Sequence, residues 1–206
     1  MRLAIMADSH DNLANLKKTL VYLNRQGIKL IIHCGDIASD ETLEKMVNFF
    51  PGNIYFTFGN ADNIPLAKTL PGLHQKSPSG QAPVVECRAF TTGQVKLNFC
   101  DKFGEIEIDD KKIAFTHFPS QGRKLAKSGK YDLVFYGHTN KPWIQQMQIN
   151  ADISVDQRTD ISVDQRSSKS VLLVNPGNLC GVFYKATFAV YDTRTNKLEL
   201  KILELL

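Results

Sequence analysis

The stretch Leu3-Ala4-Ile5-Met6-Ala7-Asp8-Ser9-His10 decides the fold of this 206-residue chain. Its five apolar residues predict a buried strand, and the strand ends in a carboxylate and an imidazole. Four further apolar runs are also followed by polar residues, in three cases after a glycine. These segments are Gly35-Asp36, Gly59-Asn60, His117 and Gly137-His138-Thr139-Asn140. Ligands of open α/β sheets bind at the carboxyl ends of the strands, so we expect these side chains to converge on one rim.

Helical patterns separate the first three predicted strands. Residues 12–26 carry leucines at helical spacing, and Gly27 suits the left-handed turn that ends a helix. Residues 41–50 form a second such pattern, which Pro51-Gly52 ends. The order strand, helix, strand, helix, strand predicts a parallel sheet that is covered by helices.

The rest of the chain continues this pattern with two additions. We expect a strand before His117, a short helix at 123–127, a strand before His138 and another at 171–174. A hairpin of residues 187–191 and 198–203 closes the chain.

The two additions interrupt a single domain of residues 1–206. Residues 73–101 are rich in Pro and Gly, and we interpret them as a surface excursion or small cap near the site. Residues 152–167 contain an eight-residue unit in two near-perfect tandem copies. Two copies are too few for a solenoid, so they are interpreted as a lengthened hairpin tip.

Composition limits the classes of function. The chain is 43% hydrophobic and 22% charged, as globular proteins are, and its apolar runs are too short to cross a membrane. The first residues enter a strand without a signal-peptide pattern, which predicts a cytoplasmic protein. A net charge of +4 favours phosphate-bearing substrates but is too small to predict specific nucleic-acid binding. The four cysteines lack zinc-ribbon spacing and are expected to be thiols.

The five motifs occur in the order shown by the calcineurin-like metallophosphoesterases. The chain resembles the small bacterial and archaeal phosphodiesterase branch of that superfamily over nearly its whole length. The resemblance implies a four-layer α/β-β/α sandwich, in which two mixed sheets are flanked by helices. It also implies a single metallophosphoesterase domain and a metal-dependent phosphodiesterase that acts on small, nucleotide-like phosphate esters.

The resemblance further implies two divalent metal ions. Asp8 and His10 would hold the first, Asp36 would bridge both, and Asn60, His117 and His138 would hold the second. Carboxylate, imidazole and amide ligands together suit Mn²⁺ first, with Ni²⁺, Fe²⁺ or Zn²⁺ as alternatives. A hydroxide between the two ions would attack phosphorus in line, so no further catalytic residue is assigned.

Three positions near these ligands need separate comment. Asn140 stands where the superfamily usually has the last histidine of the first site, which predicts a weaker first site. Ala61 stands where many members have a histidine that donates a proton, so we expect substrates with good leaving groups. Asp62 is expected to orient a ligand rather than to bind metal.

Two alternative functions stay open at this point. The same fold serves as a non-catalytic scaffold in the retromer coat subunit, where the metal ligands have decayed. A phosphomonoesterase would use the same ligands and differ only in how the pocket treats the second ester group.

Overall fold

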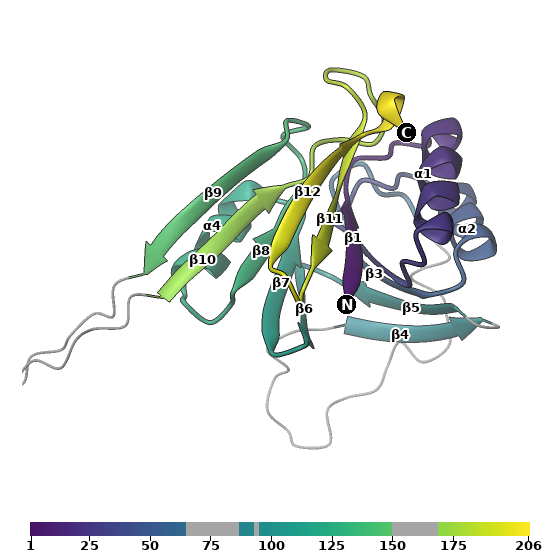
Figure 1. Cartoon of the computed structure of the whole chain (residues 1–206). Coiled ribbons are helices and arrows are strands. Elements are labelled where there is room, and N and C mark those ends of the chain that lie inside the picture. Colours follow the sequence, from purple (N-terminus) through teal and green to yellow (C-terminus); the bar gives the residue numbers. More distant parts are fainter. Residues whose placement is uncertain (65–86, 93–94, 150–168) are drawn as a thin grey trace, which may run out of the picture.

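The computed structural model describes residues 1–64, 87–92, 95–149 and 169–206, which form two packed β-sheets with helices on their outer faces (Figure 1). The larger sheet has the strand order β12-β11-β1-β2-β3-β5-β4. Its strands are β1 (Arg2–Met6), β2 (Leu30–His33), β3 (Asn53–Thr57), β4 (Cys87–Thr92), β5 (Val95–Cys100), β11 (Thr187–Asp192) and β12 (Lys197–Ile202). β1, β2, β3 and β5 are parallel, and the flanking pairs are antiparallel.

The smaller sheet has the strand order β6-β7-β8-β10-β9. Its strands are β6 (Phe103–Ile108), β7 (Lys111–Thr116), β8 (Leu133–Phe135), β9 (Trp143–Ile149) and β10 (Lys169–Asn175). β7, β8 and β10 run parallel, whereas the two edge strands pair antiparallel. Both sheets are therefore mixed.

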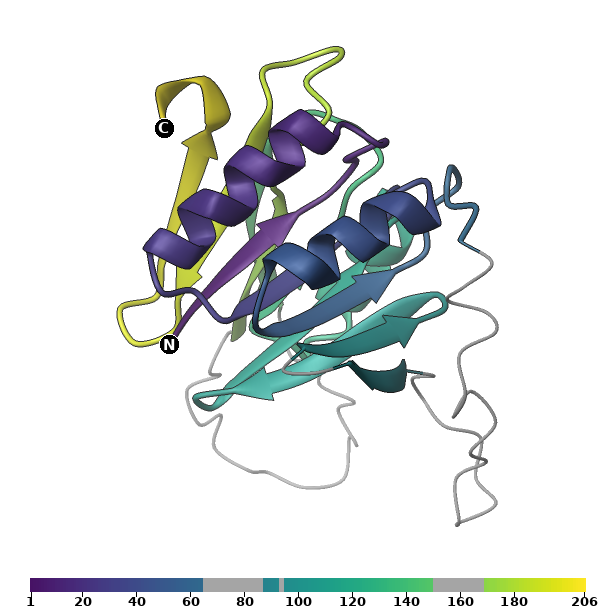
Figure 2. The same ribbon diagram turned by 90° about the vertical axis from the view of Figure 1, so that its right-hand side faces the viewer.

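The helices complete four layers. α1 (Leu13–Arg25) and α2 (Asp40–Phe49) lie side by side over the larger sheet (Figure 2). α4 (Pro119–Lys127) packs on β7, β8 and β10 of the smaller sheet. A short 3₁₀ helix, η1 (Leu203–Leu205), contacts α1.

Three apolar clusters fill the three interfaces between these layers, and β1 shows how the sequence divides between them. Ala4 and Met6 pack in the cluster beneath α1 and α2. Leu3, Ile5 and Ala7 point to the opposite face and pack in the cluster between the sheets. Because side chains alternate along a strand, an unbroken apolar run buries both faces. The predicted four-layer α/β-β/α sandwich is confirmed.

Part of the predicted surface excursion belongs to the sheet instead. β5 pairs in parallel with β3, and Leu97 and Phe99 are core residues. The interpretation of residues 95–100 as a surface addition is therefore wrong. β4, at residues 87–92, belongs to the same sheet and pairs antiparallel with β5. Residues 73–86 and 93–94, together with the tandem repeat at 152–167, lie outside the described residues.

The expectation for the cysteines is corrected at one position. Cys34 and Cys180 are free buried thiols, but Cys100 is disulfide-bonded. In the register of β4 with β5, the residue directly opposite Cys100 is Cys87. None of the helices in the described ranges is long and apolar enough to span a membrane.

Candidate metal centre

The predicted ligands lie on loops that follow five strands, and the loop backbone there is strained. Left-handed φ angles occur at Asp8 (53°), His10 (41°), Asp36 (58°), His138 (69°) and Asn140 (59°). Residues other than glycine avoid this region, and such strain gathers at functional sites. The left-handed backbone of these loops therefore costs folding free energy, and it orients these side chains toward the site.

Two glycines allow the loops to approach one another. A β-carbon at Gly59 would collide with the Asp36 carboxylate, and one at Gly137 would lie 3.0 Å from Asp8 Oδ2. Only glycine leaves this space without moving an acidic side chain.

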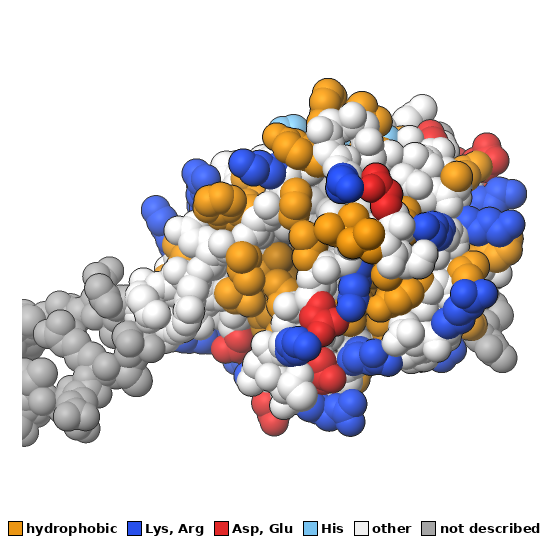
Figure 3. Space-filling view, turned by 45° about the horizontal axis from the view of Figure 1, so that its top comes forward, with side chains coloured by type: hydrophobic (Ala, Val, Ile, Leu, Met, Phe, Trp, Pro, Cys, Tyr) orange, Lys and Arg blue, Asp and Glu red, His pale blue; other side chains and the backbone are white. Residues whose placement is uncertain are grey.

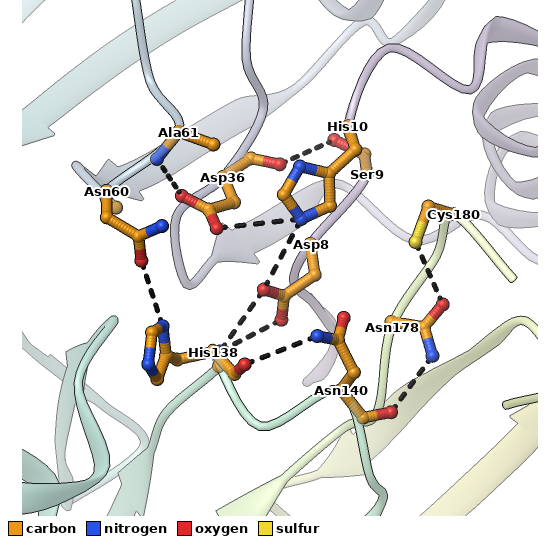
Figure 4. Close-up of polar contacts among 12 residues, drawn as sticks. Asp8, Ser9, His10, Asp36, Asn60, Ala61, His138, Asn140, Asn178 and Cys180 are labelled. Atoms are coloured by element: carbon orange, nitrogen blue, oxygen red, sulfur yellow. Dashed lines mark hydrogen bonds and ion pairs between the residues drawn. The ribbon is translucent and has the colours of Figure 1, made fainter. Parts of the chain in front are cut away.

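One group of donors contains Asp8, His10 and Asp36, whose candidate ligand atoms all lie within 4.8 Å of one another (Figure 4). His10 Nε2 lies 3.9 Å from Asp8 Oδ1 and 3.5 Å from Asp36 Oδ2. These separations suit donor atoms that share one cation.

A second group of donors meets on the other side of Asp36. His138 Nδ1 lies 2.9 Å from Asn60 Oδ1 and 3.2 Å from His117 Nε2. His117 Nε2 is also 3.1 Å from Asn60 Oδ1 and 3.4 Å from Asp36 Oδ2. Nitrogen and oxygen atoms that can ligate a metal therefore converge from β3, β7, β8 and β2.

The Asp36 carboxylate lies between the two groups. Its Oδ2 faces His10 on one side and His117 on the other. Its Oδ1 accepts a hydrogen bond from the Ala61 backbone N–H at 2.8 Å, which fixes the plane of the carboxylate. This is the arrangement that a bridging ligand requires.

The environment of His117 fixes which ring nitrogen is free. Nδ1 lies 2.8 Å from the Cys34 carbonyl oxygen, which can only accept, so Nδ1 carries the proton. Burial lowers the pKa of His117 and keeps the ring neutral. The Nε2 lone pair therefore faces the site, as metal ligation demands.

Asp8 is a fully buried carboxylate. Burial, and next the charge of Asp36, raise its pKa from 3.8 to about 8. In the described ranges, the ion pairs of Asp8 and Asp36 involve histidines and no lysine or arginine. Two buried acids at short range without a fixed cation are costly, and a divalent cation removes that cost. The residues fit metal ions.

Asn140 lies beside Asp8, on the side of the site away from Asn60 (Figure 4). Its Nδ2 donates to the His138 carbonyl oxygen at 3.3 Å. Its Oδ1 is buried and has no hydrogen-bond partner. A buried amide oxygen seldom stays unpaired, so this atom has the character of a ligand.

Asp62 organises the loops from behind and does not enter either donor group. Its Oδ2 accepts hydrogen bonds from the backbone N–H groups of Asp36 at 2.9 Å and Gly59 at 2.6 Å. Its Oδ1 accepts from the Ala38 N–H at 2.9 Å. These contacts agree with the expected orienting role.

Two asparagines near the site had no functional role assigned from the sequence: Asn175 was interpreted only as part of a tight turn, and Asn178 was not considered. The fully buried Asn175 donates to the Gly137 carbonyl oxygen at 3.0 Å and to Thr139 Oγ1 at 2.8 Å. Asn178 donates to the Asn140 carbonyl oxygen at 2.9 Å. Both hold the loop that carries His138. The available signal was the position of Asn175 at the end of a sixth strand, β10.

His33 does not belong to either donor group. His33 is buried and pairs through Nε2 with Ser9 Oγ at 3.1 Å, but its Nδ1 has no partner. Burial lowers its pKa to about 3, so the ring is neutral. His74 lies outside the described residues.

The fold and the site agree with the comparison to known families. A sequence model of the calcineurin-like phosphoesterase superfamily domain matches residues 1–196. Such a match defines a metal-dependent phosphoesterase. Because it spans nearly the whole chain, this chain belongs to the calcineurin-like phosphoesterase superfamily, which confirms the resemblance seen in the sequence.

Individual proteins extend this result. A phosphodiesterase of Methanocaldococcus jannaschii is 28% identical over 209 residues, which cover 99% of this chain and 100% of that protein. A solved archaeal phosphodiesterase is 25% identical with a TM-score of 0.65, and the match covers 98% of this chain and 99% of that one. Vps29 of Entamoeba histolytica, solved with Zn²⁺, is 14% identical, with a TM-score of 0.56 and coverage of 97% and 90%. This last likeness concerns the fold alone.

Proposed function

We propose that this chain hydrolyses phosphodiesters of small, nucleotide-like molecules with two divalent metal ions, of which Mn²⁺ is the first candidate. The observation that carries the proposal is the position of Asp36 Oδ2, 3.5 Å from His10 Nε2 and 3.4 Å from His117 Nε2. One carboxylate is thereby shared by two sets of donors. The phosphodiesterase relative supports the diester as the substrate class.

Each ion would be held by three residues of its own and by Asp36, which both ions would share. The first would be held by Asp8, His10, Asp36 and Asn140, and the second by Asp36, Asn60, His117 and His138. When bound, such a pair lowers the pKa of water and takes up charge that develops on the phosphoryl oxygens. The chain supplies the geometry that the pair needs.

The chain's own contribution is mainly rigid positioning. Asp62 fixes two loops, and the hydrogen bond from Ala61 fixes the plane of Asp36. His138 donates its backbone N–H to Asp8 Oδ2 at 3.0 Å, which ties the donor groups together. Donors held in advance need little reorganisation during the reaction.

The side chain of Ala61 has no proton to donate to the leaving group of the substrate. General acid catalysis usually contributes about 10²–10⁴-fold, so a poor leaving group would depart slowly from this site. Diesters whose leaving group is stable as an anion are therefore the expected substrates.

The test is an assay of purified protein on bis(p-nitrophenyl) phosphate. After treatment with EDTA, the protein should be inactive, and Mn²⁺ or Ni²⁺ should restore turnover. Activity that persists in EDTA would contradict the proposal. Faster turnover of p-nitrophenyl phosphate would favour the monoesterase alternative. No uptake of Mn²⁺ at micromolar concentration, measured by elemental analysis, would favour the scaffold.

Asn140→His is expected to strengthen the first site. An imidazole binds Mn²⁺ or Ni²⁺ better than an amide oxygen, and we expect about tenfold tighter binding, roughly 1.4 kcal/mol. Calorimetric titration with Ni²⁺ measures the change. Asn196→His is the matched control, because Asn196 is exposed in the β11–β12 turn and also has a left-handed φ of 56°. Unchanged or weaker binding in Asn140→His would place Asn140 outside the first site.

The remaining expectations rest on the sequence. The cytoplasmic location and the lack of specific nucleic-acid binding stay predictions, as does the identity of the metal.

A further inference from the structure

Exposed apolar residues follow three of the loops that form the metal centre. Phe118 comes directly after His117, Trp143 begins β9 three residues after Asn140, and Val182 and Phe183 follow the loop of Asn178. Figure 3 shows hydrophobic side chains beside histidine atoms at the upper edge of the molecule. His10 and His138 are the exposed histidines in the described ranges. Apolar surface next to a polar site is typical of ligand binding.

Phe118 is an exposed apolar residue whose ring contacts two of the proposed ligands. Its ring centroid lies 4.9 Å from that of His117 and 5.3 Å from that of His138. The ring meets His117 edge to face, at an interplanar angle of 81°, and is tilted by 57° to His138. Its side chain nevertheless remains 42% exposed. One part of the ring therefore contacts two proposed ligands while the rest faces solvent.

The backbone holds Phe118 in this position. It is the N-cap residue of α4, with extended φ and ψ of −83° and 132°, and Pro119 follows at the first helical position. Pro119 restricts Phe118 to this extended conformation. A capping residue usually has a polar side chain, but Phe118 makes no side-chain capping hydrogen bond. The phenyl ring therefore has no capping role in the helix.

We propose that Phe118 forms a stacking surface for a planar aromatic group on the substrate, either a nucleobase or an aryl ester. The inference rests on the proposed function and adds to it the chemical class of the ester group. The Phe118 ring contacts both His117 and His138, so a phosphate bound at the metal ion that these histidines would hold would lie beside this ring. The ester group that the phosphate carries can then lie on the exposed part of the ring. Stacking of a base on an aromatic side chain stabilises such complexes and tolerates different bases.

Binding of monoesters, which correspond to products of diester hydrolysis, tests this directly. Competitive inhibition or calorimetry with Mn²⁺-loaded protein would compare AMP, phenyl phosphate and methyl phosphate in wild type and in Phe118→Leu, which keeps an apolar side chain but removes the aromatic face. The preference for AMP or phenyl phosphate over methyl phosphate should fall about fivefold or more in Phe118→Leu. Phe118→Trp should restore it. A larger fall for AMP than for phenyl phosphate identifies the nucleobase, and the reverse identifies the aryl ester.

Phe49→Leu is the matched control. Phe49 is 44% exposed, close to the value for Phe118, but lies at the end of α2 under Lys17. Its substitution should leave the preference unchanged. If Phe118→Leu lowers the binding affinity for all three ligands by the same factor, Phe118 only shields the imidazoles of His117 and His138 from solvent, and the proposal is overturned. An unchanged preference overturns it as well.

Hydrolysis separates this inference from the proposed function. Methyl, phenyl and thymidine 5′-(p-nitrophenyl) phosphates share a leaving group and differ only in the ester that is retained. The ratio of kcat/KM for the aromatic esters to that for the methyl ester should fall in Phe118→Leu, as the binding ratio does. If wild type hydrolyses none of them, the proposed function fails, whereas the binding ratios still decide the role of Phe118.

Discussion

Asp36→Asn is expected to lower kcat/KM for bis(p-nitrophenyl) phosphate by about 10³-fold or more, because the substitution removes the carboxylate that both donor groups share. The metal pair contributes several kcal/mol, and each 1.36 kcal/mol is tenfold in rate. Asparagine suits the site in other respects. It tolerates the left-handed φ of 58°, and its oxygen can still accept the hydrogen bond from Ala61. Its amide nitrogen would face His10 and His117 and repel a cation.

Asp110→Asn is the control for this substitution. Asp110 is exposed in the β6–β7 turn and has a φ of 61°, so the same chemical change occurs in the same backbone conformation. Its kcat/KM should match that of wild type. If Asp36→Asn keeps more than about a tenth of wild-type kcat/KM, two metal ions bridged by Asp36 do not carry the reaction.

His117→Asn is expected to empty the second site while the fold survives. The asparagine amide nitrogen lies about where histidine Nδ1 was, so it can still donate to the Cys34 carbonyl oxygen. It presents no lone pair in place of Nε2. Bound Mn²⁺, measured by elemental analysis, should fall from about two to about one ion per chain. We expect kcat/KM to fall by at least about 10²-fold, since one ion cannot replace the pair.

Thermal unfolding separates a lost metal from a damaged fold. In EDTA, His117→Asn and wild type should have similar Tm values. Mn²⁺ at about 100 times its Kd adds roughly 2.7 kcal/mol per site, so wild type should gain more in Tm than the variant. An equal gain in both proteins, with two ions still bound, would remove His117 from the ligands.

The sequence predicted the parts of the fold that are buried on both faces. β1, β2, β3, β7 and β8 each contain a run of apolar residues and lead to the predicted donors. The local signal is strong in such strands, because every position must be apolar. Their shared parallel direction then brings Asp8, Asp36 and His138 together.

The two edge strands of the smaller sheet, β6 and β9, were not predicted from the sequence. β6 alternates Glu105 and Glu107 with apolar residues, and β9 contains three glutamines. An edge strand has a face or a side in water, so its sequence is mixed and resembles a loop. The supporting contacts of Asn175 and Asn178 were missed for another reason: they join segments that are far apart in the sequence.

The strained loops also bear on how such a site is lost during evolution. A residue other than glycine, asparagine or aspartate in the left-handed region costs roughly 1–2 kcal/mol, and the proposed ligands His10 and His138 carry that cost. Consider a descendant protein that is no longer under selection for activity. A substitution to glycine at these positions would remove the backbone strain, and it would also remove the metal-binding side chain. Decay of the centre would then increase thermal stability, so selection for folding alone offers it no protection.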